Sequence, residues 1–134
     1  MTMRHFNPPG LSKPVGYSHI AEVTGGKTIY ISGQIALDAD GNLVGGNDMR
    51  KQTMQVFKNI QTALTAVGAD FSSVVKLTYF VVNMVHMPVV REVRDQFIHT
   101  ENPPASSAFE VKSLVRSDLL IEIEAIAVVP LQNP

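Results

Sequence analysis

The chain of 134 residues contains no cysteine, no long apolar run and no cluster of basic residues. The missing cysteines exclude disulfides, thiolate nucleophiles and metal sites with cysteine ligands. No stretch approaches the ~18 apolar residues of a membrane span. Lys and Arg number 11 against 12 Asp and Glu, and they are scattered along the chain. Since a nucleic-acid binder needs a basic stripe to neutralise phosphates, we expect neither a nucleic-acid nor a membrane partner.

Several signatures of known active sites are also missing. The four histidines, His5, His19, His86 and His99, lack the spacing of a metal site, and no carboxylate cluster supplements them. There is no G-x-S-x-G motif, no P-loop and no dinucleotide-binding fingerprint. We therefore expect no metal and no cofactor. The N-terminal residues lack the apolar run of a signal peptide, which leads us to expect a cytoplasmic protein.

The composition, with 45% hydrophobic and 17% charged residues, is that of a globular protein, and the length predicts one domain over residues 1–134. Apolar residues at spacings of three and four predict a helix over 48–67, with Asn47 or Asp48 as its cap and Gly68 at its end. Pro88 suits the first turn of a second helix, which runs to about His99. Strands are predicted at 20–24, 27–31, 35–37, 74–82, 109–111 and 119–129.

The last predicted strand, Leu119–Val129, is apolar on the face of its odd-numbered residues. Glu122 and Glu124 lie side by side on the opposite face. Carboxylates resist burial without partners, so this face borders either solvent or a polar site. The residues leave both readings open.

The order of the elements predicts an α+β fold, a mixed sheet with two helices packed on one face. Strict alternation of strand and helix, as in a doubly wound fold, is absent. The other face of such a sheet needs a partner, and a closed ring of subunits would bury it.

The C-terminal third carries a recognisable combination. A proline-bounded turn of small residues at 103–108 precedes a short strand, a polar linker and the sequence E-I-E-A-I-A-V. This combination resembles the C-terminal signature of the Rid (YjgF, endoribonuclease L-PSP) family, and the earlier segments fit the same family. The resemblance implies a chorismate-mutase-like single domain with a mixed six-stranded sheet. It also implies a homotrimer that binds a small molecule in clefts at its subunit interfaces, with hydrolytic deamination of enamines or imines as its activity.

The resemblance also implies a set of site residues. Glu122 would position the attacking water. The segment Ser32-Gly33-Gln34 would line the cleft, and a glycine inside a strand often marks a bulge or a close approach. Tyr17 either contacts the ligand or is a packed aromatic residue. Ser107 is a further candidate for ligand binding.

The chain departs from the family pattern in the proline-bounded turn. Ser106 stands where the deaminases carry an arginine that grips the carboxylate of a 2-imino acid, and Ala108 stands at a frequent cysteine. A serine offers one neutral donor in place of a charged fork. Arg91 or Arg116 could replace the lost cation, unless both are solvated surface residues. Alternatively, the ligand is not a carboxylate.

Two functions follow from these observations. The first is a deaminase acting on a small enamine or imine other than 2-iminopropanoate. The second is a non-catalytic module that binds or senses a small metabolite on the same trimeric scaffold.

Overall fold

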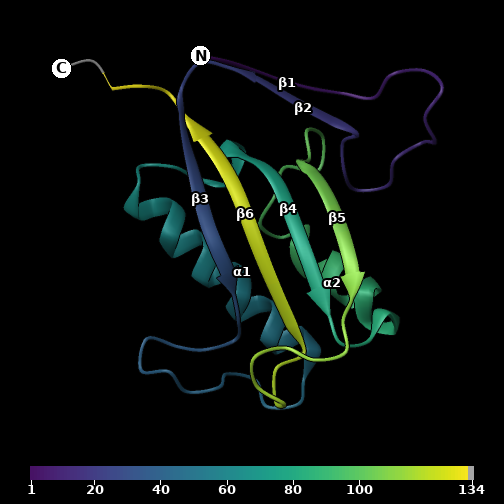
Figure 1. The fold of residues 1–134 in the computed structure, drawn as a ribbon, viewed down its shortest axis with the longest axis vertical. Coiled ribbons are helices and arrows are strands. Elements are labelled where there is room, and N and C mark those ends of the chain that lie inside the picture. The colour runs from purple at the N-terminus through teal and green to yellow at the C-terminus, as the bar shows by residue number, and fades with distance from the viewer. Residues whose placement is uncertain (133–134) are drawn as a thin grey trace.

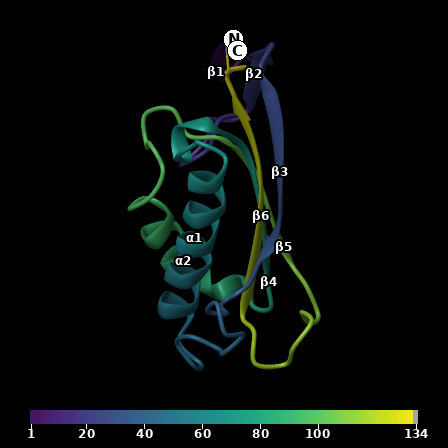
Figure 2. The ribbon, with the colours of Figure 1, turned by 90° about the vertical axis from the view of Figure 1, so that its left-hand side faces the viewer.

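The structure, a computed structural model, describes residues 1–132 and contains two helices packed on one face of a mixed sheet (Figures 1 and 2). The helices and strands are β1 (Thr2–Phe6), β2 (Ile20–Thr24), β3 (Lys27–Gln34), α1 (Met49–Ala66), β4 (Val74–Val81), α2 (Met87–Arg94), β5 (Ala105–Glu110) and β6 (Ile121–Val129). Short 3-10 turns, η1 (Phe71–Ser73) and η2 (Met84–His86), precede β4 and α2. The predicted α+β class is confirmed.

The strands form two sheets. The main sheet has the order β3-β6-β4-β5, in which β6 is antiparallel to β3 and β4 while β4 and β5 are parallel. The strands β1 and β2 form a separate antiparallel pair. Gly25 and Gly26, with φ of +78° and +86°, turn the chain between β2 and β3, so that β2 pairs with β1 instead of β3. The single six-stranded sheet that the family resemblance implied is therefore wrong: the six strands are divided between a sheet of four and a sheet of two.

The predicted strands at 109–111 and 35–37 differ from the structure, and β1 was not predicted. The strand predicted at 109–111 begins earlier, at Ala105, and ends at Glu110. The segment 35–37 is not a strand and makes one isolated bridge, between Leu37 and Leu43. The ladder between β3 and β6 shifts register between Ile31 and Gln34, and β3 ends there. The segment Thr2–Phe6, which lacks the apolar alternation of a core strand, forms β1 because β2 offers it a free edge.

The main helix α1 follows its sequence signals. The Asp48 side chain accepts a hydrogen bond from the Lys51 backbone N–H, and Gly68 adopts the left-handed conformation beyond the C-terminus with φ of +72°. Its apolar stripe is buried against the sheet, and Phe57 is fully buried. Truncation of such a buried phenylalanine to alanine typically costs about 3–5 kcal/mol.

The second helix is shorter than predicted and ends at Arg94. Pro88 lies in its first turn, as expected. The following residues leave the helix, and the Phe97 ring stacks on that of Phe57 with centroids 5.2 Å apart. This contact attaches the end of α2 to α1.

The strand β6 lies inside the main sheet, and its two faces differ as predicted. Its odd-numbered residues are buried under the helices, whereas Glu122 is half-buried and Glu124 is exposed on the other face. No helix within residues 1–132 is long and apolar enough to cross a membrane. The sheet face that carries the two carboxylates has no helix over it (Figure 2).

Candidate functional site

A cavity of about 150 Å³ opens beside the edge strand β5. Its walls come from α2, β4, β5 and the segment before β2, and consist of Val15, Tyr17, Tyr79, Met87, Arg91, Arg94, Ser106, Ser107 and Ala108. Four residues predicted from the sequence as ligand-binding are among them: Tyr17, Arg91, Ser106 and Ser107. Tertiary folding therefore brings together groups that are up to ninety positions apart in the chain.

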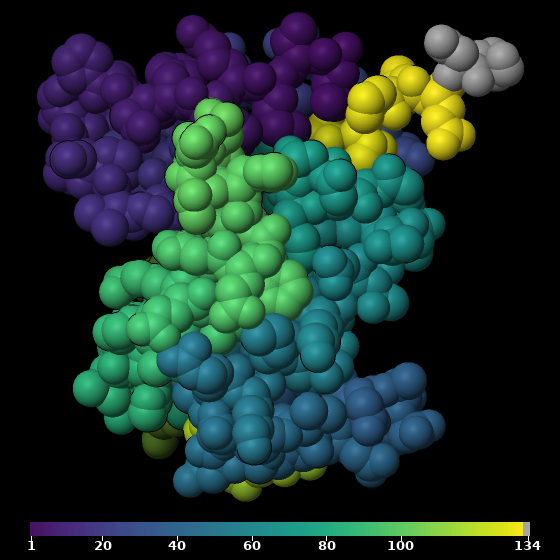
Figure 3. All heavy atoms as spheres, turned by 180° about the vertical axis from the view of Figure 1, so that it is seen from behind, coloured from purple at the N-terminus to yellow at the C-terminus, as the bar shows by residue number. Residues whose placement is uncertain are grey.

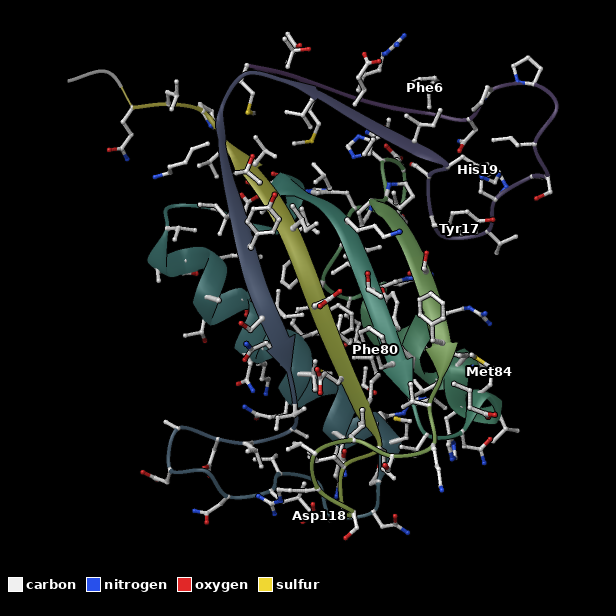
Figure 4. The ribbon with its side chains drawn as sticks, in the orientation of Figure 1. Phe6, Tyr17, His19, Phe80, Met84 and Asp118 are labelled. Atoms are coloured by element: carbon white, nitrogen blue, oxygen red, sulfur yellow. The ribbon has the colours of Figure 1, made fainter. Side chains whose placement is uncertain are left out.

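Two hydrogen bonds hold Tyr17 at this cavity. The Ser18 hydroxyl donates to the Pro103 carbonyl oxygen at 2.6 Å, and the Ser18 backbone N–H donates to the Pro104 carbonyl oxygen at 3.1 Å. Both prolines are buried. Figure 3 shows the N-terminal segment, in purple, against the green segment that leads into β5, and Figure 4 shows Tyr17 and His19 together in that N-terminal segment. The proline-bounded turn thus positions Tyr17 as well as the strand that follows it.

The two serines of β5 face opposite sides of the sheet. Ser106 pairs with Leu77, whose side chain is buried on the helix side. Ser107 pairs with Thr78, and its hydroxyl accepts a hydrogen bond from the Lys76 ammonium at 3.0 Å. Directly paired residues share a face, so the Ser106 hydroxyl belongs to the helix side, with the arginines of α2. Ser107 also lines the cavity, although its hydroxyl is bonded to Lys76 on the open face.

A buried arginine that the sequence analysis missed lines the same cavity. Arg94 is 7% exposed, and its guanidinium group bonds the Asp95 carboxylate at 2.9–3.0 Å. Gly16, with φ of +77°, makes room for this group, because a Cβ atom there would lie 2.3 Å from Nη2 of Arg94. The spacing of Met87, Val90 and Arg94 places all three on one face of a helix. That spacing was the available signal for a buried arginine.

The Tyr79 hydroxyl is the second group that the sequence did not indicate. Tyr79 is 2% exposed, and its hydroxyl has no hydrogen-bond partner among residues 1–132. Burial raises the pKa of Tyr79; the Arg94 charge opposes that shift, although its guanidinium group lies outside hydrogen-bonding geometry. The phenol therefore stays protonated and can donate a hydrogen bond. An unsatisfied buried hydroxyl costs about 1–3 kcal/mol.

Glu122 lies on the other face of the sheet, next to Gly33. A Cβ atom at Gly33 would lie 2.1 Å from the Glu122 carboxylate oxygen Oε2. The strand β3 is bulged here, between Ile31 and Gln34, as the glycine predicted. Gly33 is not in the left-handed region, so the glycine is needed for space and not for its backbone angle.

The remaining predicted residues of β3 lie near Glu122 and away from the Tyr17 cavity. Ser32 lines a cavity of about 220 Å³ on the open face, together with Lys76, Thr78 and Glu124. The Gln34 side chain donates to the Ser32 carbonyl oxygen at 3.0 Å. The predicted site residues therefore form two groups in one chain.

The two groups are on opposite faces of the main sheet. Glu122 pairs with Phe80, while Tyr79, the residue before it, lines the cavity on the helix side. Side chains alternate along a strand, so Glu122 and the cavity cannot meet across a single chain.

Arg116 is not part of either group. Its guanidinium group bonds the Asp118 carboxylate at 2.6 and 3.1 Å, and these bonds lower the pKa of Asp118. Asp118 lies at the end of the molecule far from Tyr17 (Figure 4). The prediction that Arg116 could supply a cation for the ligand is not supported within one chain, whereas Arg91 does line the cavity. Within residues 1–132, no group of three or more His, Asp or Glu side chains is arranged to hold a metal ion.

Comparison with known proteins gives consistent matches. The family model described as Endoribonuclease L-PSP matches residues 11–129. A RutC family protein of Pyrococcus abyssi is 36% identical over 116 residues, which cover 86% of this chain and 88% of that protein. The 2-iminobutanoate/2-iminopropanoate deaminase of Homo sapiens is 39% identical over 103 residues, covering 76% and 73%. A crystal structure of a conserved Rid family protein from Yersinia pestis superimposes with a TM-score of 0.85 at 38% identity, covering 96% of this chain and all of that one.

Proposed function

Because the chain belongs to the Endoribonuclease L-PSP family, which includes the Rid proteins, we propose that it hydrolyses a small enamine or imine and releases ammonia. The family predicted from the C-terminal motif is confirmed, and deamination of enamines and imines is supported at the level of the family by the named deaminases among its relatives. The observation that carries the proposal for this chain is the Glu122 carboxylate, held in the space that Gly33 leaves free on the open sheet face.

In the proposed reaction, Glu122 acts on water. The carboxylate accepts a proton from a water molecule while the water oxygen attacks the electrophilic carbon of the C=N bond. The resulting carbinolamine takes up a proton at nitrogen, the C–N bond breaks, and ammonia leaves while a carbonyl group forms. The net reaction converts an imine and water into a ketone and ammonia, and it needs no oxidant or reductant. General base catalysis of this kind typically contributes about 10²- to 10⁴-fold.

We further propose that the site is completed by a second copy of the chain in a homotrimer. Glu122 and the Tyr17 cavity lie on opposite faces of one sheet, so a cleft that contains both requires two subunits. The open face also exposes large apolar side chains: Tyr30 is 78% and Phe109 is 52% exposed, and Phe109 stacks on Phe80 with centroids 5.9 Å apart. Closed rings of identical subunits bury such surfaces.

The substrate is proposed to be other than 2-iminopropanoate, because Ser106 offers no charge on β5. A charge-assisted hydrogen bond contributes roughly 1.5–3 kcal/mol, or roughly 10- to 150-fold in affinity. We expect slow turnover of 2-iminopropanoate and 2-iminobutanoate by the wild type. The Ser106→Arg variant should turn over both faster. Fast wild-type turnover that the arginine does not improve would refute this choice of substrate.

The proposed chemistry is tested by replacing one carboxylate at a time. Imines generated in situ from a panel of amino acids are supplied, and ammonia release is followed in a coupled assay. Glu122→Gln should lower the rate by about 10²-fold or more, while Glu124→Gln, on the same face of the same strand, should alter it far less. Full activity of Glu122→Gln would remove this residue from the mechanism. If the wild type releases no ammonia from any imine, the non-catalytic binding module becomes the better description.

The assembly is tested separately by light scattering at micromolar concentration. A trimer should have about three times the 14.6 kDa mass of the chain. A stable monomer would exclude the shared cleft.

A further inference from the structure

Arg94 is a buried cation whose positive charge is only partly neutralised by its salt-bridge partner. Only 7% of the residue is exposed, and the carboxylate of Asp95, its salt-bridge partner within residues 1–132, is itself about half exposed at 46%. Taking a guanidinium group out of water is costly unless it is paired and hydrogen-bonded. The fold nonetheless reserves space for it by placing Gly16 against it. An arginine held in this way at a cavity wall indicates a site for an anion.

The Tyr79 hydroxyl gives an independent indication of a ligand. It is buried, has no hydrogen-bond partner among the residues that the structure describes and lines the same cavity as Arg94. Since nearly all buried polar groups in proteins find partners, an unpaired donor beside a cavity indicates a partner that enters it. A protonated phenol is suited to bonding an oxygen anion.

The remaining walls define the size and character of the ligand. Arg91 lies one helical turn from Arg94 on α2 and forms no salt bridge within the part of the chain that the structure describes. Val15, Met87 and Ala108 add apolar surface. With about 150 Å³ of space, the cavity suits a small molecule with one anionic end and a short apolar body.

We infer that Arg94, Arg91 and the Tyr79 hydroxyl together bind the carboxylate group of a small organic acid. The cation that β5 lacks at Ser106 is thereby supplied from α2, in the helix layer. Because this cation lies in the helix layer and not on β5, the bound carboxylate lies deeper in the cavity. An acid whose carboxylate is separated from the C=N carbon by one or more carbons spans this longer distance better than 2-iminopropanoate, in which the two groups are directly bonded. The identification of this acid as the substrate rests on the proposed deaminase function; the carboxylate site does not.

The test measures binding without turnover. Stable oxo acids, 2-oxopropanoate and 4-oxopentanoate, are titrated into the full-length protein by calorimetry, with butanone as the neutral control. We expect both acids to bind, 4-oxopentanoate more tightly, and butanone to bind far more weakly. Arg94→Gln should weaken binding roughly 10- to 150-fold, the range for loss of a charged hydrogen bond. Arg94→Lys should recover part of it, and Tyr79→Phe should give a smaller loss.

The matched control is Arg116→Gln, which removes an arginine that is paired with Asp118 outside the cavity. It should leave affinity unchanged. Arg91→Gln, at an exposed position, provides a variant whose folding is not at risk, and it should also weaken the acids. The inference is overturned if no acid binds the wild type, if butanone binds equally well, or if Arg94→Gln and Arg91→Gln retain full affinity. Carboxylate binding without turnover of any imine would instead refute the deaminase and leave this site standing.

Discussion

The two halves of the proposed site are built in different ways on the two faces of one sheet. On the helix side, Arg94 and Tyr79 are buried; Arg94 lies against Gly16, and Tyr79 is a residue of β4. On the open side, Glu122 is half-buried, and its position depends on the empty space at Gly33. In our proposal, the first half is a preformed binding pocket. The second half is a catalytic carboxylate whose surroundings are completed by another subunit.

This difference assigns different tasks to the two faces. A buried cation and an unpaired hydroxyl are destabilising on their own, and in our proposal a bound anion compensates both. A carboxylate near solvent retains access to water, which is what a hydrolytic step requires. Because the two faces of one chain cannot meet, binding and chemistry are coupled in our proposal only through the assembly.

The largest effect should come from mixing two inactive variants. Glu122→Gln loses the base, and Arg94→Gln loses the anion site. Trimers made of either variant alone should therefore release ammonia slowly. If every cleft takes Glu122 from one chain and Arg94 from the next, random trimers of the two co-expressed variants contain about one intact cleft in four. Ammonia release should then recover to about a quarter of the wild-type rate. A mixture that gives only the average of its parents would place both residues in the same subunit's site.

Gly33→Ala should disturb the open face alone. The new methyl group would meet the Glu122 carboxylate, which is the flexible end of a side chain and can move aside. Stability should therefore change little, whereas displacing a catalytic group by about 1 Å can cost about 10²-fold in rate. Thermal unfolding and ammonia release are measured together. In the Glu122→Gln background the same substitution should have no further effect on rate, and a large additional loss there would show that Gly33 acts independently.

Gly16→Ala should disturb the helix side, with Gly10→Ala as its matched control. Both glycines have positive φ, but a Cβ atom meets the Arg94 guanidinium at position 16 and nothing within 4 Å at position 10. Both substitutions therefore introduce backbone strain. The additional loss in the free energy of unfolding at position 16, of order 1–3 kcal/mol, measures the contact with Arg94. Chemical denaturation measures both. Equal losses of stability would mean that Arg94 adjusts freely.

The smallest effect concerns Tyr79 at high pH. Its pKa is raised in the folded protein, so above the ordinary tyrosine value near 10 the unfolded chain loses this proton first. Stability is unaffected below that pH, and above it stability should fall by up to about 1.4 kcal/mol per pH unit. Tyr79→Phe should remove this component without lowering stability at pH 7, because the deleted hydroxyl is buried with no hydrogen-bond partner among residues 1–132 and is itself destabilising. Denaturant midpoints between pH 8 and 11 for both proteins provide the measurement.

Local patterns were sufficient to predict much of this molecule. The apolar stripe of α1 and the alternation along β6 follow from spacings of three to four and of two, which depend on neighbouring residues only. The bulge at Gly33 was predicted for the same reason. The strand at 35–37 was a wrong prediction, because a short apolar stretch forms a strand only where a partner edge is in register.

The site required the tertiary structure. Sequence alone placed Tyr17, Arg91 and Ser106 among candidates but could not show that they share one cavity, since the Ser18 bonds to Pro103 and Pro104 span 85 positions or more. Burial of Arg94 and isolation of the Tyr79 hydroxyl are likewise decided by which segments pack together. The sequence by itself determined most of the elements, the family and the pair of carboxylates on β6. Only the folded sheet decided that the cavity and Glu122 lie on opposite faces, because side-chain direction becomes a position in space only when strands are paired.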